Sequence, residues 1–127
     1  MIDVVCGIIY KDDKVFFCRR NRSKQMGGLW EFPGGKLESD EMPENALRRE
    51  LLEELEMEVT DVNYFHTCVH QYEEFTIRLS AYKCNFLRST FRMTDHDKWD
   101  WVDIGALLKK NIAPADLPIV EKLMKEQ

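Results

Sequence analysis

The stretch WEFPGGKLESDEMPENALRRELLEELEMEV, which runs from Trp30 to Val59, decides how the rest of the chain is interpreted. Its Pro-Gly-Gly triplet at 33–35 is a strong turn signal, whereas the residues from Pro43 to Glu56 are mainly good helix formers. Proline suits the first helical turn, where its missing N–H has no partner to lose. The stretch therefore predicts a loop followed by a helix over roughly residues 43–56.

The predicted helix carries acidic side chains on one face and apolar side chains on the other. At about 100° per residue, Glu50, Glu53 and Glu54 share one face, and the opposite face is predicted to pack in the core through Leu51, Leu52 and Leu55. Like charges at this spacing destabilise an isolated helix, so the three carboxylates favour a bound cation. Carboxylate oxygens suit Mg²⁺ or Mn²⁺, and Mg²⁺ usually binds together with substrate phosphates. The residues alone leave two interpretations open, a metal–phosphate site and an acidic solvated surface.

The spacing of these residues resembles a known motif. In chain order the fixed positions are Gly35, five residues, Glu41, seven residues, Arg49, Glu50, Leu51, one residue, Glu53 and Glu54. This pattern resembles the Nudix box, which is far more specific than a lone glycine-rich loop. The preceding segment 31–36, Glu-Phe-Pro-Gly-Gly-Lys, is similar to the MutT branch of that family. The resemblance implies the Nudix fold, an α/β/α sandwich.

Glu56 departs from the motif, which has a second glycine at this position. Glycine there would end the helix in a left-handed conformation, and any other residue adopts that backbone at a cost of about 1 kcal/mol. The helix is therefore expected either to end at that cost or to run on by a residue or two. The preceding carboxylates are unaffected in both cases.

The composition predicts a single globular domain that spans residues 1–127. With 44% hydrophobic residues, the chain is long enough to bury one core. Its formal net charge of -5 disfavours nucleic acid as a partner, because phosphate binding by electrostatics alone needs a basic surface. No run has the length of a membrane span or the pattern of a signal peptide. We therefore expect a cytoplasmic monomer or weak dimer without nucleic-acid or membrane partners.

Two sets of residues that often bind metals elsewhere are interpreted as structural. The cysteines are isolated within apolar segments and are expected to be buried free thiols: Cys6, Cys18, Cys68 and Cys84. His66 and His70 have the spacing of helical metal ligands, but their setting is a strand. They are therefore expected to be ordinary polar residues of a sheet rather than a zinc site.

The remaining segments predict an α+β fold, in which a mixed β-sheet has helices on both faces. In chain order we expect a hairpin of strands 4–10 and 14–20, a second hairpin of strands 59–68 and 75–86, a polar loop over 87–98, a strand over 99–102 and two closing helices. Asp103 is expected to cap the first closing helix, and the last one is expected to begin near Asp116. Pro118 suits the first turn of the last one.

The family resemblance implies roles for particular residues of the helix and a late loop. Glu50, Glu53 and Glu54 are implied as metal ligands, with the backbone carbonyl of Gly34 beside them. Arg49 is implied to orient a carboxylate through a bidentate bond. Asp95 matches the position of a loop acid that is usually Glu, one carbon longer, and it is implied as a further metal ligand. Either Glu53 or Asp95 is the general base, since geometry decides which reaches the water.

The resemblance also implies the residues that hold a nucleotide. Arg20, within a basic run, is implied to contact it, and Phe32 and Tyr72 form the walls of the base pocket. Asp116 matches a base-reading position that is usually Asn. An ionised Asp only accepts hydrogen bonds, which favours bases with donor groups. Asp116 therefore either reads the base, caps the last helix, or does both.

The implied function is a metal-dependent nucleoside triphosphate pyrophosphohydrolase of the MutT type. It would release nucleoside monophosphate and pyrophosphate, with 8-oxo-dGTP and other oxidised nucleotides as substrates. A related alternative is a CTP or 5-substituted dCTP pyrophosphatase, whereas an ADP-sugar hydrolase usually carries further segments. A Nudix-like domain that binds nucleotides without turnover is the alternative from another functional class, although the box glutamates are all present.

Overall fold

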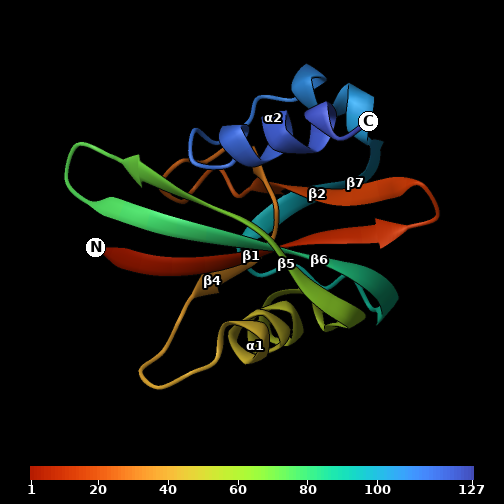
Figure 1. Cartoon of the computed structure of the whole chain (residues 1–127), viewed down its shortest axis with the longest axis horizontal. Helices are drawn as coiled ribbons and strands as arrows, with labels where there is room; N and C mark the ends of the chain where they lie inside the picture. The colour runs from red at the N-terminus through yellow and green to blue at the C-terminus, as the bar shows by residue number, and fades with distance from the viewer.

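The computed structural model describes residues 1–127, and it confirms a mixed sheet with helices on both faces (Figure 1). The seven strands are β1 (Ile2–Lys11), β2 (Lys14–Arg20), β3 (Trp30–Glu31), β4 (Gly34–Lys36), β5 (Met57–Gln71), β6 (Thr76–Ser89) and β7 (His96–Asp103). The helices are α1 (Pro43–Leu55), the 3-10 helix η1 (Ile104–Lys109) and α2 (Leu117–Lys125).

Both predicted hairpins form, because β1 pairs antiparallel with β2 and β5 pairs antiparallel with β6. The second hairpin joins the first through a parallel pairing of β6 with β1. The expected loop over 87–98 was too long, since β6 extends to Ser89 and β7 begins at His96. The first residues of β7, 96–98, are polar and give no strand signal in the sequence. They belong to the strand because β7 pairs with β2 over the whole of Lys14–Arg20.

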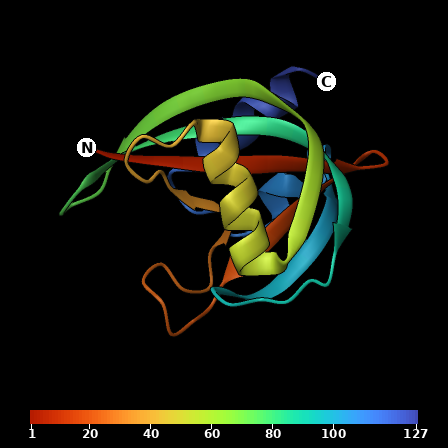
Figure 2. The ribbon, with the colours of Figure 1, turned by 90° about the horizontal axis from the view of Figure 1, so that it is seen from below.

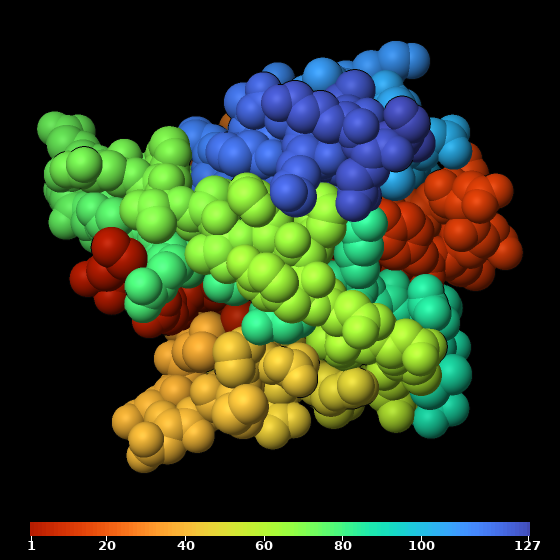
Figure 3. Space-filling view, in the orientation of Figure 1, coloured from red at the N-terminus to blue at the C-terminus, as the bar shows by residue number.

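The sheet separates two hydrophobic cores, one beneath each helix layer (Figures 1 and 2). Alternate residues of β2 enter different cores, as expected for an extended strand. Val15 and Phe17 pack with α2 residues, whereas Phe16 and Cys18 pack with α1 residues. Each helix therefore covers one face of a sheet that is buried on both sides at its centre. The space-filling view shows α2 and α1 on opposite sides of the strands (Figure 3).

Helix α1 packs through Ala46, Leu47, Leu51 and Leu55, but the expectation that Leu52 packs in the core is wrong. Leu52 is 52% exposed, whereas Leu51 is buried. Each residue of an α-helix is rotated by about 100° from the one before it, and this rotation turns Leu52 away from the sheet. By contrast, Glu54 is only 8% exposed. One member of the acidic face is therefore buried against the sheet.

The helix ends in the left-handed conformation, so it does not run on. Glu56 has φ 49° and ψ 42°, and its N–H donates to the carbonyl of Leu52 at 3.0 Å. The side chain contacts only surface residues, accepting from Thr90 and pairing with Arg92 at 3.5 Å. The chain thus adopts a glycine-type backbone without glycine.

The predicted side-chain caps are absent. Asp103 and Asp116 precede η1 and α2, yet neither side chain bonds to the first N–H groups of its helix. The first of these helices is also a 3-10 helix. The carboxylate of Asp116 is instead used in a tertiary contact, described below, whereas Asp103 pairs with Lys14 at the surface. Pro118 lies in the first turn of α2 as expected.

The cysteines are free thiols, three of them buried, and Cys68 is half-buried. His66 and His70 lie in β5, and nowhere in the chain do three or more His, Cys, Asp or Glu side chains form a ready-made metal cluster. No helix is long and apolar enough to cross a membrane.

Replacing Glu56 tests the cost of the left-handed helix end. Glu56→Gly is expected to raise the free energy of unfolding by about 1 kcal/mol, because glycine adopts this backbone without strain. Chemical denaturation measures the change. Glu56→Ala is the matched control, since it removes the same side-chain contacts and keeps the strain. Equal stability of the two variants would contradict the prediction.

Candidate functional site

The site forms where β1 and β2 diverge. These strands pair only at Tyr10 and Lys11, near their turn, and further on each takes another partner. Strand β3 pairs with β2 at Cys18 and Arg19, whereas β4 pairs with β1 over Val4–Cys6. The segment 30–36 therefore crosses the opening between the two halves of the sheet. This places the Pro-Gly-Gly turn at the centre of the molecule.

Close approach explains both glycines of this turn. A Cβ on Gly34 would overlap the backbone of Val5. That backbone cannot move aside, because β1 is paired with β4 at this point. A Cβ on Gly35 would overlap the carboxyl group of Glu50 on α1. The acidic face of the helix is therefore in direct contact with the backbone of β4.

Arg49 organises most of the acidic face. Its guanidinium donates two hydrogen bonds to Glu41, from Nε at 2.7 Å and from Nη2 at 2.9 Å, which is the bidentate geometry expected of it. These bonds hold the pKa of Glu41 down to about 2. Nη1 also donates to Glu50 at 3.0 Å and to Glu53 at 3.2 Å, and Nη2 donates to the Lys36 carbonyl. Arg49 thus joins α1 to β4 and fixes three carboxylates.

Glu54 lies apart from this cluster and beside Asp95. Burial, reinforced by the neighbouring Asp95 and Glu50, raises the pKa of Glu54 to about 9. Its Oε2 is buried and has no hydrogen-bond partner in the protein. Burial by itself would raise the pKa of Asp95. The ion pair with Lys24, at 3.2 Å, acts in the opposite direction, and the pKa of Asp95 is lowered overall. Burying an unpaired carboxylate is costly, so this position is suited to a proton or a cation.

The three helix glutamates do not converge on one point in this structure. Glu50 and Glu53 are turned toward Arg49, and Glu54 is turned toward Asp95. Their donor set nevertheless consists entirely of carboxylate oxygens, the ligands that Mg²⁺ and Mn²⁺ prefer. The unpartnered Glu54 Oε2 is the observation that fits a bound cation best.

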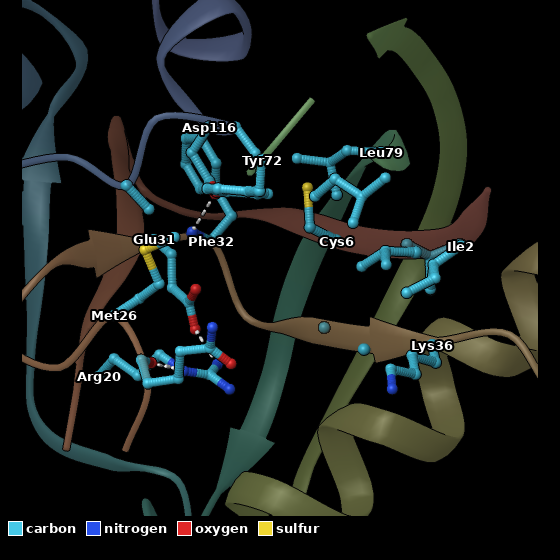
Figure 4. A pocket seen from close by; sticks show the side chains of 18 of the residues that line it. Ile2, Cys6, Arg20, Met26, Glu31, Phe32, Lys36, Tyr72, Leu79 and Asp116 are labelled. Atoms are coloured by element: carbon cyan, nitrogen blue, oxygen red, sulfur yellow. Dashed lines mark hydrogen bonds and ion pairs between the residues drawn. The ribbon is translucent and has the colours of Figure 1, made fainter. Parts of the chain in front are cut away.

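A cavity of about 450 Å³ lies beside this acidic face (Figure 4). Its walls are mostly apolar, and it brings together all four residues that were expected to contact a nucleotide: Arg20, Phe32, Tyr72 and Asp116. Phe32 packs against Phe17 with ring centroids 4.9 Å apart, so this wall is continuous with the hydrophobic core. The glycines of β4 line the same cavity. A ligand in it would therefore lie next to the carboxylates.

Asp116 is a buried acid aimed at the crossing segment. It is 5% exposed, and its Oδ2 accepts a hydrogen bond from the backbone N–H of Phe32 at 2.9 Å. Burial, with a further contribution from Glu31, raises the pKa of Asp116 well above its ordinary range. A carboxyl oxygen accepts hydrogen bonds, and the carboxyl group donates one only when it is protonated. That Asp116 acts as an acceptor toward a base stays a prediction.

The basic run does not act as a unit. Arg19 pairs with Asp97 at 2.7 Å and Lys24 pairs with Asp95, whereas Arg22 is exposed. Only Arg20 lines the cavity, where it donates to Glu31 at 3.1 Å and to the Gln25 carbonyl at 3.0 Å.

Two residues of this site did not stand out in the sequence. Glu31 lines the cavity, and His96 is buried behind it with its Nε2 2.8 Å from Glu31 Oε2. The one signal that could have pointed to them is their place in the sequence, because Glu31 precedes Phe32 and His96 follows Asp95, two residues that were expected in the site. Without the pairing of β7 with β2, nothing in the sequence brings these two segments together.

The NUDIX domain family profile matches residues 4–122, almost the whole of the chain. The chain belongs to the Nudix family. This Nudix protein is 36% identical over 124 residues to the CTP pyrophosphohydrolase of Escherichia coli strain K12, covering 98% of this chain and 92% of that protein. It is also 43% identical over 82 residues to the 8-oxo-dGTP diphosphatase of Proteus vulgaris, covering 64% of this chain and 73% of that protein.

Solved structures agree with the family assignment. The solution structure of the E. coli ORF135 protein superposes on this Nudix protein with a TM-score of 0.86 at 36% identity. The match covers 98% of this chain and 89% of that one. The fold predicted from the Nudix box is therefore confirmed.

Gly35→Ala tests the contact between β4 and the acidic helix. The added methyl group would displace the Glu50 carboxylate, which can move because it ends a flexible side chain. We expect Mn²⁺ affinity, measured by electron paramagnetic resonance, to fall about tenfold, a size typical of changes that disturb ligand orientation. The melting temperature should change little.

Gly105→Ala is the matched control, because a Cβ there meets nothing closer than 4.0 Å. Unchanged Mn²⁺ affinity in Gly35→Ala would show that the position of Glu50 does not matter for metal binding.

Proposed function

We propose that this Nudix protein is a metal-dependent nucleoside triphosphate pyrophosphohydrolase of the MutT type. Its substrates are oxidised nucleoside triphosphates such as 8-oxo-dGTP, which it hydrolyses to nucleoside monophosphate and pyrophosphate. The observation that carries the proposal is the position of β4, which lines the cavity and also contacts Glu50 of the acidic helix. The 8-oxo-dGTP diphosphatase and CTP pyrophosphohydrolase among the relatives support the same reaction class.

In this proposal the acidic face holds Mg²⁺ or Mn²⁺. Glu50, Glu53 and Glu54 are the ligands, together with Asp95 and the carbonyl of Gly34. When bound, such an ion neutralises phosphate charge and lowers the pKa of a water molecule. The unpartnered oxygen of Glu54 and the all-oxygen donor set support this assignment.

The protein's own groups orient the reactants. Arg49 keeps Glu50 and Glu53 in place through its hydrogen bonds to both. The proton of the attacking water passes to Glu53, whose side chain is 59% exposed, or to Asp95, whose side chain is 32% exposed. Both carboxylates are open to water, so both remain candidates for the general base.

The cavity takes the nucleoside part of the substrate. Phe32 and Tyr72 provide aromatic walls that suit a flat base, and Arg20 offers a cationic group at the same cavity. Asp116 presents its second oxygen to the base, because the first is bonded to Phe32. We expect the reaction to clear oxidised nucleotides from the precursors of DNA replication, and so to contribute to DNA repair, in a cytoplasmic monomer or weak dimer.

A second substrate class, CTP or a 5-substituted dCTP, is favoured by one specific observation. Asp116 is bonded to Phe32 through one oxygen, and a carboxyl group can accept a hydrogen bond from the exocyclic amine of cytosine at the other, where the family resemblance implies an amide. The similarity to a CTP pyrophosphohydrolase over almost the whole chain supports this candidate.

A panel of normal and oxidised nucleoside triphosphates tests the proposed reaction. With Mg²⁺ the protein is expected to release pyrophosphate rather than phosphate, and chelation of the metal should abolish turnover. Chromatographic separation of the products distinguishes the two cleavage positions. The panel also decides between the 8-oxoguanine and cytosine candidates. If no nucleotide is hydrolysed above background, the enzymatic assignment is wrong.

Glu54→Gln is expected to lower kcat at least a hundredfold, because it removes a charged metal ligand. Glu58→Gln is the matched control, since Glu58 pairs with Arg88 at the surface of β5 and β6. Activity of this control should equal that of the wild type. Comparable rates for Glu54→Gln and Glu58→Gln would place the metal site elsewhere.

Asp116→Asn tests which group reads the base. The amide oxygen can still accept from Phe32, but its NH₂ group would then only donate toward the cavity. We expect the ratio of kcat/KM for CTP over UTP to fall about tenfold while the best substrate keeps most of its turnover. An equal loss on every nucleotide would instead indicate a structural role for Asp116.

A further inference from the structure

His96 is a buried polar residue to which the proposed reaction assigns no role. Its side chain is 1% exposed, and its Nδ1 has no hydrogen-bond partner. Its one side-chain hydrogen bond joins Nε2 to Oε2 of Glu31 at 2.8 Å. A buried imidazole with an unpaired nitrogen costs free energy that an apolar side chain would not. The contact with Glu31 is therefore the property of His96 that needs an explanation.

The same oxygen of Glu31 accepts a second hydrogen bond, from Nη1 of Arg20 at 3.1 Å. Two donors on Oε2 fix the plane of the carboxylate and leave Oε1 without a partner in the protein. Glu31 lines the same cavity as Asp116, which is likewise bonded through one oxygen (Figure 4). The cavity thus contains two acids, each anchored through one oxygen and free at the other.

The backbone fixes His96 on the side of the cavity. His96 is the first residue of β7, where it pairs with Arg20 across a β-bulge. The carbonyl of the preceding Asp95 accepts from the N–H of Asn21 at 2.9 Å, which anchors the strand start. Neighbouring side chains of an extended strand point in opposite directions. Asp95 accordingly lies beside Glu54, and His96 lies beside Glu31.

We propose that His96 is a positioning residue that presents the free oxygen of Glu31 to the exocyclic amine of the bound base, next to Asp116. Glu31 touches the base, and His96 acts through Glu31 by donating from its Nε2–H. This inference rests on the proposed function and adds to it the origin of a preference for bases that carry an amine.

The preference follows from the direction of the hydrogen bond. A base amine donates to Glu31 Oε1, whereas a carbonyl at the same place would set two acceptors against each other. Sites built to bond a polar group reject analogues that cannot form the bond, because the buried partner is left unpaired. If Glu31 were free to turn, it could swing away from the carbonyl. Its two anchors, Arg20 and His96, prevent this.

Pairs of nucleotides that differ in one group test the proposal. CTP and UTP differ at C4 by an amine and a carbonyl, and 8-oxo-dGTP differs from 8-oxo-dITP by its amine alone. For the pair that the wild type hydrolyses, His96→Leu is expected to lower the kcat/KM ratio of amine over non-amine about tenfold. The change should lie in KM, with kcat within about twofold.

Two further variants separate positioning from stability. His96→Gln keeps a donor toward Glu31 and should retain the wild-type ratio. Val102→Ala is the matched control, since Val102 is buried in the same strand and packs in the core beneath α2, away from Glu31. A wild-type ratio in His96→Leu, or an equal fall in Val102→Ala, would overturn the proposal. Melting temperatures recorded for all variants show the stability change separately.

A double-mutant cycle tests whether His96 acts through Glu31. In a Glu31→Gln background, His96→Leu is expected to change the ratio no further. Independent, additive losses from the two substitutions would overturn the proposed connection.

Binding without turnover separates this inference from the proposed function. Calorimetry with CMP and UMP, and with 8-oxo-dGMP and 8-oxo-dIMP, needs neither metal nor hydrolysis. The wild type is expected to bind one amine-bearing nucleotide about tenfold more tightly than its partner, and His96→Leu should lose this difference. If the wild type shows this difference in binding but hydrolyses no nucleotide, the proposed enzymatic function is wrong and the inference about His96 stands. Equal binding within both pairs would overturn the inference alone.

Discussion

The backbone of Gly35 lies against the carboxylate of Glu50, with no room between them for even one methyl group. This contact places the Glu50 carboxylate directly on the strand that borders the cavity. Arg49 reinforces it, because its guanidinium bonds to the Lys36 carbonyl of that strand and to carboxylates of the helix. The relation between acidic face and cavity depends on these contacts.

The opening between β1 and β2 explains why such a contact can exist in the middle of a sheet. A continuous pairing of the two strands would leave no path for the segment 30–36. Because each strand exchanges its partner, this segment crosses the sheet, and neighbouring residues serve different purposes. Glu31 is hydrogen-bonded to Arg20 and His96. Phe32 forms a wall of the cavity, and its backbone N–H donates to Asp116. The glycines have no side chain and so let the helix approach closely.

The buried polar side chains of the protein are Glu54, His96 and Asp116, and all three lie around this crossing. Two of them have an unpartnered buried atom. Groups of this kind reduce stability unless a ligand, a proton or a function accounts for them. Their concentration in one place, in a chain whose remaining core is apolar, is independent support for a binding site there.

Several features of the fold could be predicted from the residues. The order of glycine, arginine and glutamates in 35–54 identified the family, and the strand-like runs 4–10 and 14–20 predicted the first hairpin. The end of the loop over 87–98 was predicted wrongly because residues 96–98 are polar and join β7 only by pairing with β2. Leu52 was assigned to the core because helical periodicity predicts a broad apolar face but does not show where the buried part of that face ends. Asp116 was expected as a cap because a sequence shows only local partners, and its actual partner is 84 residues away.

The sequence by itself therefore determined the family, the acidic helix face and the identity of the groups proposed to bind metal and nucleotide, since these depend on local spacing and side-chain chemistry. Only the tertiary structure decided which oxygen of each acid is free and which acid is buried. It also decided that His96 and Glu31 meet. The physical reason is that burial and long-range hydrogen bonds arise from strands that are distant in the chain, and no local pattern encodes their contacts.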